Sequence, residues 1–501
     1  MNILLAYSAK HFNPEKENSA ERNFSASSAA TLARTLYHIL REMGHVEYVD
    51  GLKPPKKLAR KHYDLMVGIQ GSITPLSKLA TFDKVVLFAV NMHPRTRNRI
   101  LQDFNQRYKV CSQKHIDRNT VHFRQLDDIQ RADAVFLVGN ATVARSFLQN
   151  GKALSSIRRF NYASALPLRA ADTLSPDSVP RILYVSTEMC LRKGFDILSN
   201  MLTKFQDTPY MCGIIGGSGD ADYQYKLSNL QKQLGDKIHL HGWVDSSSPE
   251  YRNLLQQYDF VLFPSLEEGQ AGSVLDAMSQ GLIPLITRET GIDFAPLGYF
   301  LPALDSEHNE DILKRALSLA KGQILSLQKQ TLQYYQRYHL YWQNNLKRAF
   351  HYLLHTGSPW PDVSSDNSTA YHLIKGHACP SSLVYDVLDQ LELVSAGSAT
   401  AVIDCQKQQR MSWKESALHP THFTLQILHK PAKEALHLLG EANADGEDLL
   451  SAPLQAQQHP ANAWRKMITS CYTRILSLLH PSKRRRKNYY NLYRNTQDNI
   501  S

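Results

Sequence analysis

The chain has 501 residues, with 57 Lys and Arg against 46 Asp and Glu, which gives a net charge of +11. Nine basic residues and one acid lie in residues 451–501, so this segment carries +8 of that charge. The first 450 residues are nearly neutral, which excludes a uniformly basic nucleic-acid coat. A composition of 43% hydrophobic and 21% charged residues is that of a globular protein and excludes a disordered chain.

The six cysteines never occur as Cys-x-x-Cys, so the sequence predicts neither a zinc ribbon nor a disulfide framework, and a reducing compartment is expected. The apolar run within residues 1–7 is too short for a signal peptide. The sequence contains no run of 18 apolar residues, so no membrane-spanning helix is expected.

Residues 1–172 alternate between strand-like and helical patterns. A helix is expected at Ala26–Met43, where apolar residues recur every three or four positions, and Gly44 follows it where a left-handed residue often ends a helix. Short apolar runs predict strands at Ile3–Tyr7, Val46–Val49, Asp64–Ile69, Lys84–Val90 and Ala134–Val138. Strands separated by helices imply parallel pairing, with helices on both faces of the sheet.

Residues 172–180 are rich in Pro, Ser and Asp and predict an interdomain linker. The alternation then restarts over residues 173–322. Strands are expected at Ile182–Val185, Met211–Ile215, Ile238–Leu240, Phe260–Phe263 and Ile283–Ile286. Helices are expected at Gly194–Phe205, Tyr223–Leu234, Tyr251–Tyr258 and Ser273–Gln280. Two doubly wound α/β domains in tandem predict a ligand cleft between the carboxyl ends of their strands.

The remaining chain is less regular. Residues 307–354 read as one or two long helices, of which 323–354 are expected to return to the first domain. Residues 355–501 lose the strand–helix alternation and form a C-terminal extension.

The strongest local pattern runs from Phe263 to Pro284, where a strand ends, a loop with acids and glycines follows, and a helix opens near Gly272. Glycines let the backbone approach a ligand, and the first amides of a helix suit a phosphate. Glu268 lies in the loop and Asp276 one turn into the helix, so one carboxylate can face a sugar and the other a ribose diol. The alternative is an ordinary strand–loop–helix turn with solvated acids.

This segment resembles the Glu-x7-Glu region of retaining GT-B glycosyltransferases, in particular glycosyltransferase family 4, also called glycosyl transferases group 1. The family pattern is roughly Pro-Ser, two residues, Glu-Gly, then Glu-Ala-Met, Gly and Pro-Val. The matching residues are Pro264, Ser265, Glu268, Gly269, Ala277, Met278, Gly281 and Pro284. Asp276 replaces the second Glu and is one methylene shorter, so a longer ribose contact is expected.

The resemblance implies a GT-B fold and transfer of a hexosyl unit from a nucleotide diphosphate sugar to a glycan or lipid-linked acceptor, with retention of configuration. It implies that Glu268 holds the donor sugar, that Lys193 neutralises the leaving diphosphate, and that His93 contacts the sugar. Asp276 would bind the ribose. Further substrate-binding positions are Gly217, Gly242, Gly269, Gln270, Ala271, Gly272 and Ser273. No metal and no cofactor besides the donor are expected.

Two further positions depart from the family pattern. Thr187 stands where many family members have an arginine that clamps the diphosphate; Arg192 is the candidate to replace it, although the helix start is expected to point it elsewhere. Ser25–Ser28 occupies the place of a glycine-rich turn and can equally cap a helix. Ala132–Asn140 looks like the last strand of the first domain. Thr187 and Asp276 also motivate a rival hypothesis, a non-catalytic GT-B-like subunit that binds sugar or a partner protein.

Residues 462–480 predict an amphipathic helix, followed by the basic cluster Lys483–Lys487 and several tyrosines. Such a segment, residues 462–494, suits an anionic membrane surface, where each cation contributes roughly 1 kcal/mol. The alternative is an apolar stripe that packs on the protein beside a solvated tail. Nucleic-acid binding is not expected, because no recognition motif accompanies the charge. We therefore expect a cytoplasmic protein that binds peripherally to the inner face of the membrane.

Overall fold

The computed structural model places most of the first 359 residues, which form one compact unit. The described residues are 1–14, 28–110, 124–152, 156–298, 300–302, 306–340, 342–357, 359, 411–415 and 421–425. The predicted helix at 462–480, the basic cluster and Ser25–Ser27 lie outside these residues. Within the described part, no helix combines the length and the apolar character needed to cross a membrane.

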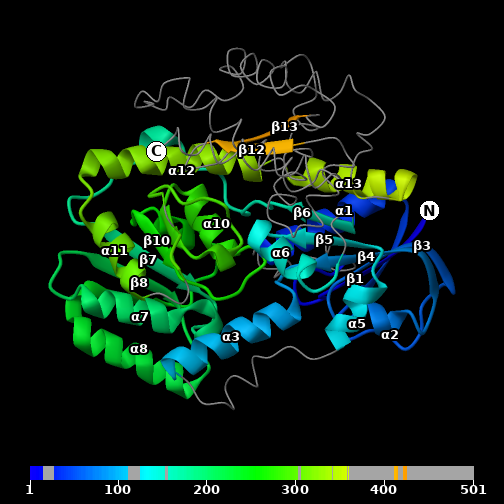
Figure 1. The fold of residues 1–501 in the computed structure, drawn as a ribbon, viewed down its shortest axis with the longest axis horizontal. Coiled ribbons are helices and arrows are strands. Elements are labelled where there is room, and N and C mark those ends of the chain that lie inside the picture. Colours follow the sequence, from blue (N-terminus) through cyan, green and yellow to red (C-terminus); the bar gives the residue numbers. More distant parts are fainter. Residues whose placement is uncertain are drawn as a thin grey trace, which may run out of the picture. The chain divides into compact units, whose positions relative to one another are not determined.

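The first sheet has six parallel strands in the order β2-β1-β3-β4-β5-β6 (Figure 1). Its strands are β1 Asn2–Tyr7, β2 His45–Asp50, β3 His62–Gly68, β4 Thr81–Ala89, β5 Ala134–Val138 and β6 Ile157–Phe160. The central strands are continuous buried apolar runs, as expected for a parallel sheet covered on both faces. All five predicted strands are present. The expectation that Ala132–Asn140 holds the last strand is wrong, because β6 pairs beyond β5.

The helices of this region are α1 Ser28–Met43, α2 Ile73–Leu76, α3 Pro94–Tyr108, α5 Arg124–Arg131 and α6 Ala141–Leu148. Asn140 caps α6, since its side chain accepts a hydrogen bond from the Val143 amide. Gly44 ends α1, but the predicted left-handed conformation is wrong, because its φ angle is not positive. A side chain is excluded there for another reason: a Cβ on Gly44 would lie 2.3 Å from the Met1 carbonyl oxygen.

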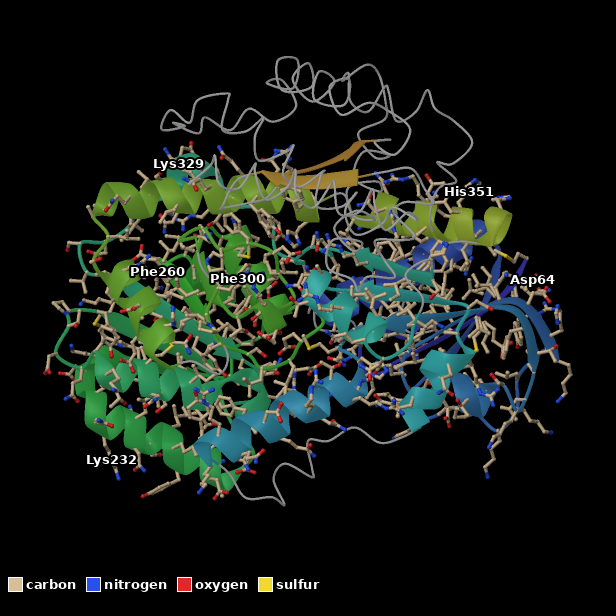
Figure 2. The ribbon with its side chains drawn as sticks, in the orientation of Figure 1. Asp64, Lys232, Phe260, Phe300, Lys329 and His351 are labelled. Atoms are coloured by element: carbon tan, nitrogen blue, oxygen red, sulfur yellow. The ribbon has the colours of Figure 1, made fainter. Side chains whose placement is uncertain are left out.

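The second sheet has five parallel strands in the order β11-β10-β7-β8-β9. Its strands are β7 Arg181–Ser186, β8 Met211–Gly216, β9 Ile238–Gly242, β10 Phe260–Phe263 and β11 Ile283–Ile286. Its helices are α7 Phe195–Lys204, α8 Ala221–Leu234, α9 Pro249–Leu255 and α10 Gly272–Ser279. Phe260 lies inside this region, whereas the exposed Lys232 and Lys329 lie on its outside (Figure 2). The two sheets with their flanking helices confirm the predicted GT-B architecture.

Three helices follow the second sheet, where one or two were expected: α11 Ser306–Leu317, α12 Lys321–His339 and α13 Trp342–Thr356. The helix α12 packs on α10 and β11, and only α13 returns to pack on β6 and α1. We call residues 1–160 together with α13 the first lobe and residues 181–339 the second lobe. The chain therefore crosses between the lobes at 161–180, which contains the predicted linker, and again between His339 and Trp342.

A second unit includes a hairpin that the sequence did not predict. Its strands β12 Met411–Glu415 and β13 Thr421–Leu425 pair antiparallel, with Trp413 opposite Phe423.

Candidate functional site

Residues 264–271, which we call the acidic loop, join the carboxyl end of β10 to the first turn of α10. Lys193 reaches this loop because the chain makes a sharp turn at Gly194, whose φ of +71° is in the left-handed region. A Cβ on Gly194 would lie 1.8 Å from the Pro264 carbonyl oxygen, so only glycine permits this approach. The turn places the cation beside the acids.

Glu268 forms ion pairs with two cations, Lys193 and Arg192. Its Oε1 lies 2.5 Å from Lys193 Nζ and 3.1 Å from Arg192 Nη1, and it accepts a hydrogen bond from Ser265 Oγ at 3.2 Å. Burial raises the pKa of the Glu268 carboxyl, but Lys193 and Arg192 outweigh burial and hold this pKa below its usual value. Glu268 is therefore a buried, charged group.

Arg192 lies in the site, so the expectation that the helix start directs it elsewhere is wrong. It precedes Lys193 in the short 3-10 turn η4 Leu191–Lys193 and donates to Glu268 Oε1 and to the Glu267 carbonyl oxygen. We call Arg192 and Lys193 the cation pair. Burial opposes the charge of Arg192, but Glu268 and Glu267 raise its pKa above the usual value.

Glu267 is a site residue that the sequence analysis missed. Its side chain is 0% exposed, and its Oε1 accepts a hydrogen bond from the Met92 amide of the first lobe at 3.1 Å. Its Oε2 lies 3.6 Å from Arg97 Nε of the first lobe and 3.8 Å from Arg192 Nη1 of the second. Glu267 therefore connects the lobes. The only signal for Glu267 in the sequence is that it is the first of two adjacent acids after the strand. The family pattern uses only the second, Glu268.

Glycine residues bring the two lobes into backbone contact at the acidic loop. A Cβ on Gly269 would lie 2.2 Å from the Val90 carbonyl oxygen and 2.8 Å from that of Val138, at the carboxyl ends of β4 and β5. Gly139 and Gly291, both with positive φ, would in turn place a Cβ 2.6 Å and 1.6 Å from the Gly269 carbonyl oxygen. Gly269, predicted to contact substrate, is thus held between main-chain segments.

Gln270, another predicted substrate contact, bonds to the segment that crosses between the lobes. Its Oε1 accepts from the Tyr162 amide at 3.0 Å, and its Nε2 donates to Asn161 Oδ1 at 2.9 Å. The Tyr162 hydroxyl donates to the Gln270 carbonyl oxygen, and the Ala271 amide donates to the Thr290 carbonyl oxygen. The structure therefore places Gln270 and Ala271 in protein contacts that fix the loop.

The helix α10 opens with Gly272 and Ser273, both partly exposed. Their amides have no acceptor within the helix. They point out of its first turn, where the helix dipole is positive. Ser273 Oγ donates to the Val185 carbonyl oxygen at 3.0 Å, which ties this helix start to the carboxyl end of β7. A ligand anion at this edge would meet the helix start and the cation pair together.

The predicted glycines Gly217 and Gly242 lie at the carboxyl ends of β8 and β9, the same edge of the sheet. A Cβ on Gly217 would have no heavy atom within 4 Å, so the space beside it is open. Gly242 has a φ of +67° and precedes Trp243, whose side chain is 71% exposed.

Asp276 is hydrogen-bonded within the protein. Ser164 Oγ donates to its Oδ1 at 2.5 Å and the Tyr251 hydroxyl donates to its Oδ2 at 3.3 Å, and the residue is 5% exposed. The Ser164 amide donates to the Tyr335 hydroxyl at 2.6 Å, which links Asp276 to helix α12. Asp276, the residue predicted to bind the ribose, is therefore already part of a hydrogen-bond network at the crossing between the lobes.

His93 follows β4 as expected, but its contacts are those of a helix cap. Its Nδ1 accepts from the Arg95 amide at 3.3 Å, and its own amide donates to Ser146 Oγ at 2.9 Å. Its ring stands edge-on to Phe147. Burial, with a smaller contribution from Arg95, lowers the pKa of His93 to about 4, so the ring is neutral at pH 7. None of these contacts of His93 is with Glu268 or Lys193.

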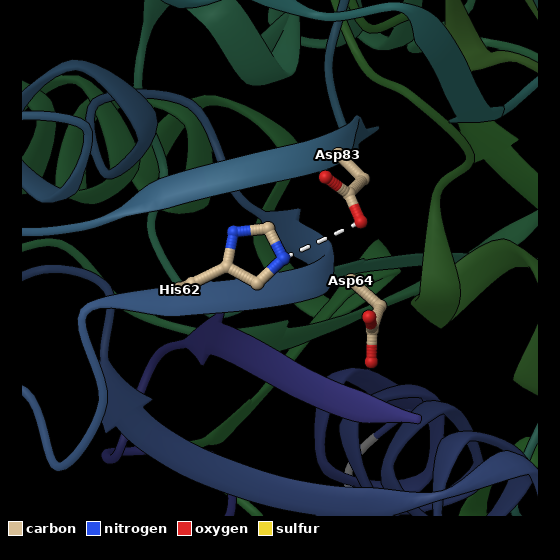
Figure 3. A group of neighbouring side chains, drawn as sticks. All are labelled: His62, Asp64 and Asp83. Atoms are coloured by element: carbon tan, nitrogen blue, oxygen red, sulfur yellow. Dashed lines mark ion pairs between the residues drawn. The ribbon is translucent and has the colours of Figure 1, made fainter.

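Potential metal ligands lie elsewhere in the described structure. His62, Asp64 and Asp83 come together at the amino ends of β3 and β4, away from the strand ends that carry the acidic loop and its partners (Figure 3).

Comparison with known proteins gives a family match in the second lobe. Residues 179–315 match the family model described as Glycosyl transferases group 1. A glycogen synthase from Finegoldia magna is 27% identical over 118 residues, which are 24% of this chain and 24% of that protein. The chain thus spans about a quarter of the length of the curated relative that it matches.

The solved structure of a sucrose-phosphate synthase from Thermosynechococcus elongatus has a TM-score of 0.50 and 14% sequence identity, over 70% of this chain and 99% of that one. The two chains therefore share their fold. The family match over residues 179–315 includes the segment from Phe263 to Pro284, which carries the resemblance to this family in the sequence.

Proposed function

We propose that this protein is a glycosyltransferase that moves a hexosyl unit from a nucleotide diphosphate sugar to a glycan or lipid-linked acceptor, with retention of configuration. The observation that carries the proposal is the cation pair Arg192 and Lys193 against Glu268, at the carboxyl end of β10 and beside the start of α10. This arrangement offers positive charge to a diphosphate and a fixed carboxylate to a sugar hydroxyl.

Transfer breaks the bond between the sugar anomeric carbon and the diphosphate oxygen, and the bonding electron pair leaves with the diphosphate. The cation pair and the first amides of α10 neutralise this charge as it develops. The acceptor hydroxyl forms the new bond on the same face of the sugar and passes its proton to a phosphate oxygen. Glu268 stays ionised, because Lys193 and Arg192 hold its pKa low, and it orients the sugar.

Arg192 takes the role of the arginine that Thr187 replaces. Its guanidinium already lies 3.1 Å from Glu268, the carboxylate that Lys193 also contacts, so both cations act on one place. A fork-shaped guanidinium binds a diphosphate through two oxygens, which a second lysine could not do.

The experiment measures release of nucleoside diphosphate from a panel of nucleotide sugars, with glycan and polyprenyl acceptors. Lys193→Met and Arg192→Gln should each lower turnover by about 100-fold or more, because each removes a charge that acts on the leaving group. Lys204→Met is the matched control, since Lys204 pairs with Glu310 on the surface. Thr187→Arg in the Arg192→Gln background should restore part of the activity.

A non-catalytic sugar-binding subunit is the second candidate, because Asp276 and Gln270 use their side chains for contacts within the protein. It predicts that nucleotide sugars raise the melting temperature of the wild type while no donor and acceptor pair gives turnover. The non-catalytic candidate is contradicted if the wild type gives turnover and the Lys193→Met variant gives none.

We propose in addition that residues 462–494 bind an anionic membrane surface, which suits a lipid-linked acceptor. The support is the basic cluster Lys483–Lys487 beside an amphipathic pattern. Co-sedimentation with vesicles of anionic lipid should fall when the cluster is changed to glutamine, and binding to neutral vesicles should be weak throughout. Equal binding of both proteins to anionic vesicles would contradict the proposal.

A further inference from the structure

The amino ends of β3 and β4 carry three potential metal ligands that take no part in the proposed transfer. The parallel register pairs His62 with Thr81 and Leu65 with Lys84, so Asp64 and Asp83 lie at the same level of the two strands between these pairs. Alternate residues of a strand share a face, so these side chains lie on one face of the sheet. The ligand atoms of His62, Asp64 and Asp83 all lie within 4.8 Å of one another (Figure 3).

Two like charges stand opposite each other in this group. Asp64 and Asp83 are on neighbouring strands, and carboxylates in directly opposite positions of a sheet destabilise the pairing. A cation between the two carboxylates relieves this repulsion. The side chains of His62 and Asp83 are 53% and 61% exposed, which leaves a path from solvent.

A contact with Thr81 orients the ring of His62. Its Nδ1 lies 3.1 Å from Thr81 Oγ1, which also lies 3.3 Å from the Lys61 carbonyl oxygen. The other ring nitrogen, Nε2, lies 3.4 Å from Asp83 Oδ2. One nitrogen of the imidazole is thus held by the strand pair, and the other faces the carboxylate.

The distances suit a metal ion. Two ligands of a tetrahedral zinc ion are about 3.3–3.5 Å apart, because Zn–N and Zn–O bonds are about 2.0–2.2 Å long. The separation of His62 Nε2 and Asp83 Oδ2 is 3.4 Å. Asp64 Oδ2 accepts from the Asn2 amide at 2.5 Å, which orients this carboxylate with Oδ1 as the remaining ligand atom.

We propose that His62, Asp64 and Asp83 bind a zinc ion, with water in the fourth position. Imidazole nitrogen and carboxylate oxygen are both zinc ligands, and the hydrogen bonds of Thr81 and Asn2 supply the orientation that such ligands need. The ion joins β3 to β4 at the edge of the sheet opposite the acidic loop. It acts on the pairing of these strands and is independent of sugar transfer.

The test uses the full chain, stripped with EDTA and then titrated with zinc chloride by calorimetry, with bound zinc per chain measured by mass spectrometry. The chain has 21 histidines, so the readout is the difference between variants. The triple variant His62→Ala, Asp64→Asn, Asp83→Asn should lose one equivalent of zinc. Thr81→Val, which removes the contact with Nδ1 together with the bond to the Lys61 carbonyl oxygen, should weaken that equivalent about 10-fold to 100-fold.

His45→Ala is the matched control, because His45 is exposed at the amino end of β2 in the same sheet, and it should bind zinc as the wild type does. Zinc should raise the melting temperature of the wild type and leave that of Asp83→Asn unchanged. In EDTA, Asp83→Asn should melt no lower than the wild type, because it removes the like-charge repulsion. An equal amount of zinc in the wild type and the triple variant, or none in the wild type, overturns the proposal.

Discussion

The two ends of strand β10 each carry a buried acid, and the two acids have opposite pKa shifts. Asp259 precedes the strand at its amino end, and burial, opposed by the Arg181 amide and charge, raises its pKa to about 6. Glu268 follows the strand at its carboxyl end, where Lys193 and Arg192 outweigh burial and lower its pKa. Both residues are buried, so burial alone does not decide their charge.

The difference lies in the partners. Asp259 accepts hydrogen bonds from the Arg181 amide and from the Gln328 side chain, which are neutral donors. Glu268 is in contact with two cations. A buried carboxylate without a close cation favours its neutral form, whereas one between two cations remains ionised. The acid at the amino end, Asp259, therefore takes up a proton more readily than usual, whereas the acid at the carboxyl end, Glu268, stays ionised.

The largest expected effect comes from removing a cation at the carboxyl end. Lys193→Met should lower the free energy of unfolding at pH 7 by about 3–5 kcal/mol, because it breaks a buried ion pair and leaves a charged partner behind. Lys204→Met, which breaks a surface pair with Glu310, should cost less than about 1 kcal/mol. Urea denaturation of both variants checks this. Equal losses would show that the Lys193–Glu268 pair behaves as a surface pair.

A smaller effect is expected where the acidic loop meets the first lobe. Gly269→Ala should lower the free energy of unfolding by about 3 kcal/mol, because its Cβ would overlap the carbonyl oxygens of Val90 and Val138. Gly217→Ala adds the same methyl group at the same edge of the second sheet, where nothing lies within 4 Å, and should leave stability nearly unchanged. Calorimetric melting separates the two. A stable Gly269→Ala variant would contradict the backbone contact between the lobes.

The smallest effect concerns pH at the amino end. The folded-state pKa of Asp259 is about 6 and its usual value is 3.8, so the folded state binds the proton more tightly than the unfolded state does. The contribution of Asp259 to stability is therefore fully present below pH 4 and falls as pH rises to 6, by about 2 kcal/mol. Asp259→Asn should remove this fall. Denaturation at pH 4, 5, 6 and 7 measures it, and parallel profiles for wild type and variant would refute the assignment.

The strands of both sheets were predictable because parallel strands are continuous apolar runs, and every predicted strand is present. Strand β6 was missed because its sequence Ile157-Arg158-Arg159-Phe160 carries two arginines, which argue against a buried strand. Both are nevertheless buried, and Arg159 pairs with Asp293 of the second lobe at 3.0 Å. A charge that is paired across two lobes cannot be recognised from its own neighbours in sequence.

The site was predictable where strand ends determine it. Glu268 and Lys193 come together because both follow neighbouring parallel strands, β10 and β7. The position of Arg192 and the role of Glu267 depend instead on the turn at Gly194 and on Met92 and Arg97 in the other lobe, 170 or more residues away in sequence. Local patterns carry no information about such partners. The same limit applies to Asp276, whose partner Ser164 comes from the crossing segment.

The second lobe is, in terms of connectivity, inserted into the first. Helix α13, which begins at Trp342, packs on β6 and α1, and the Phe350 ring lies tilted against Phe136 of β5 with ring centroids 4.7 Å apart. During synthesis the core of the first lobe therefore lacks the helix α13, which covers part of it, until the whole second lobe has left the ribosome. The second lobe, a continuous segment, has all its strands and helices by then. The packing of the first lobe is thus completed only after the second lobe has been synthesised.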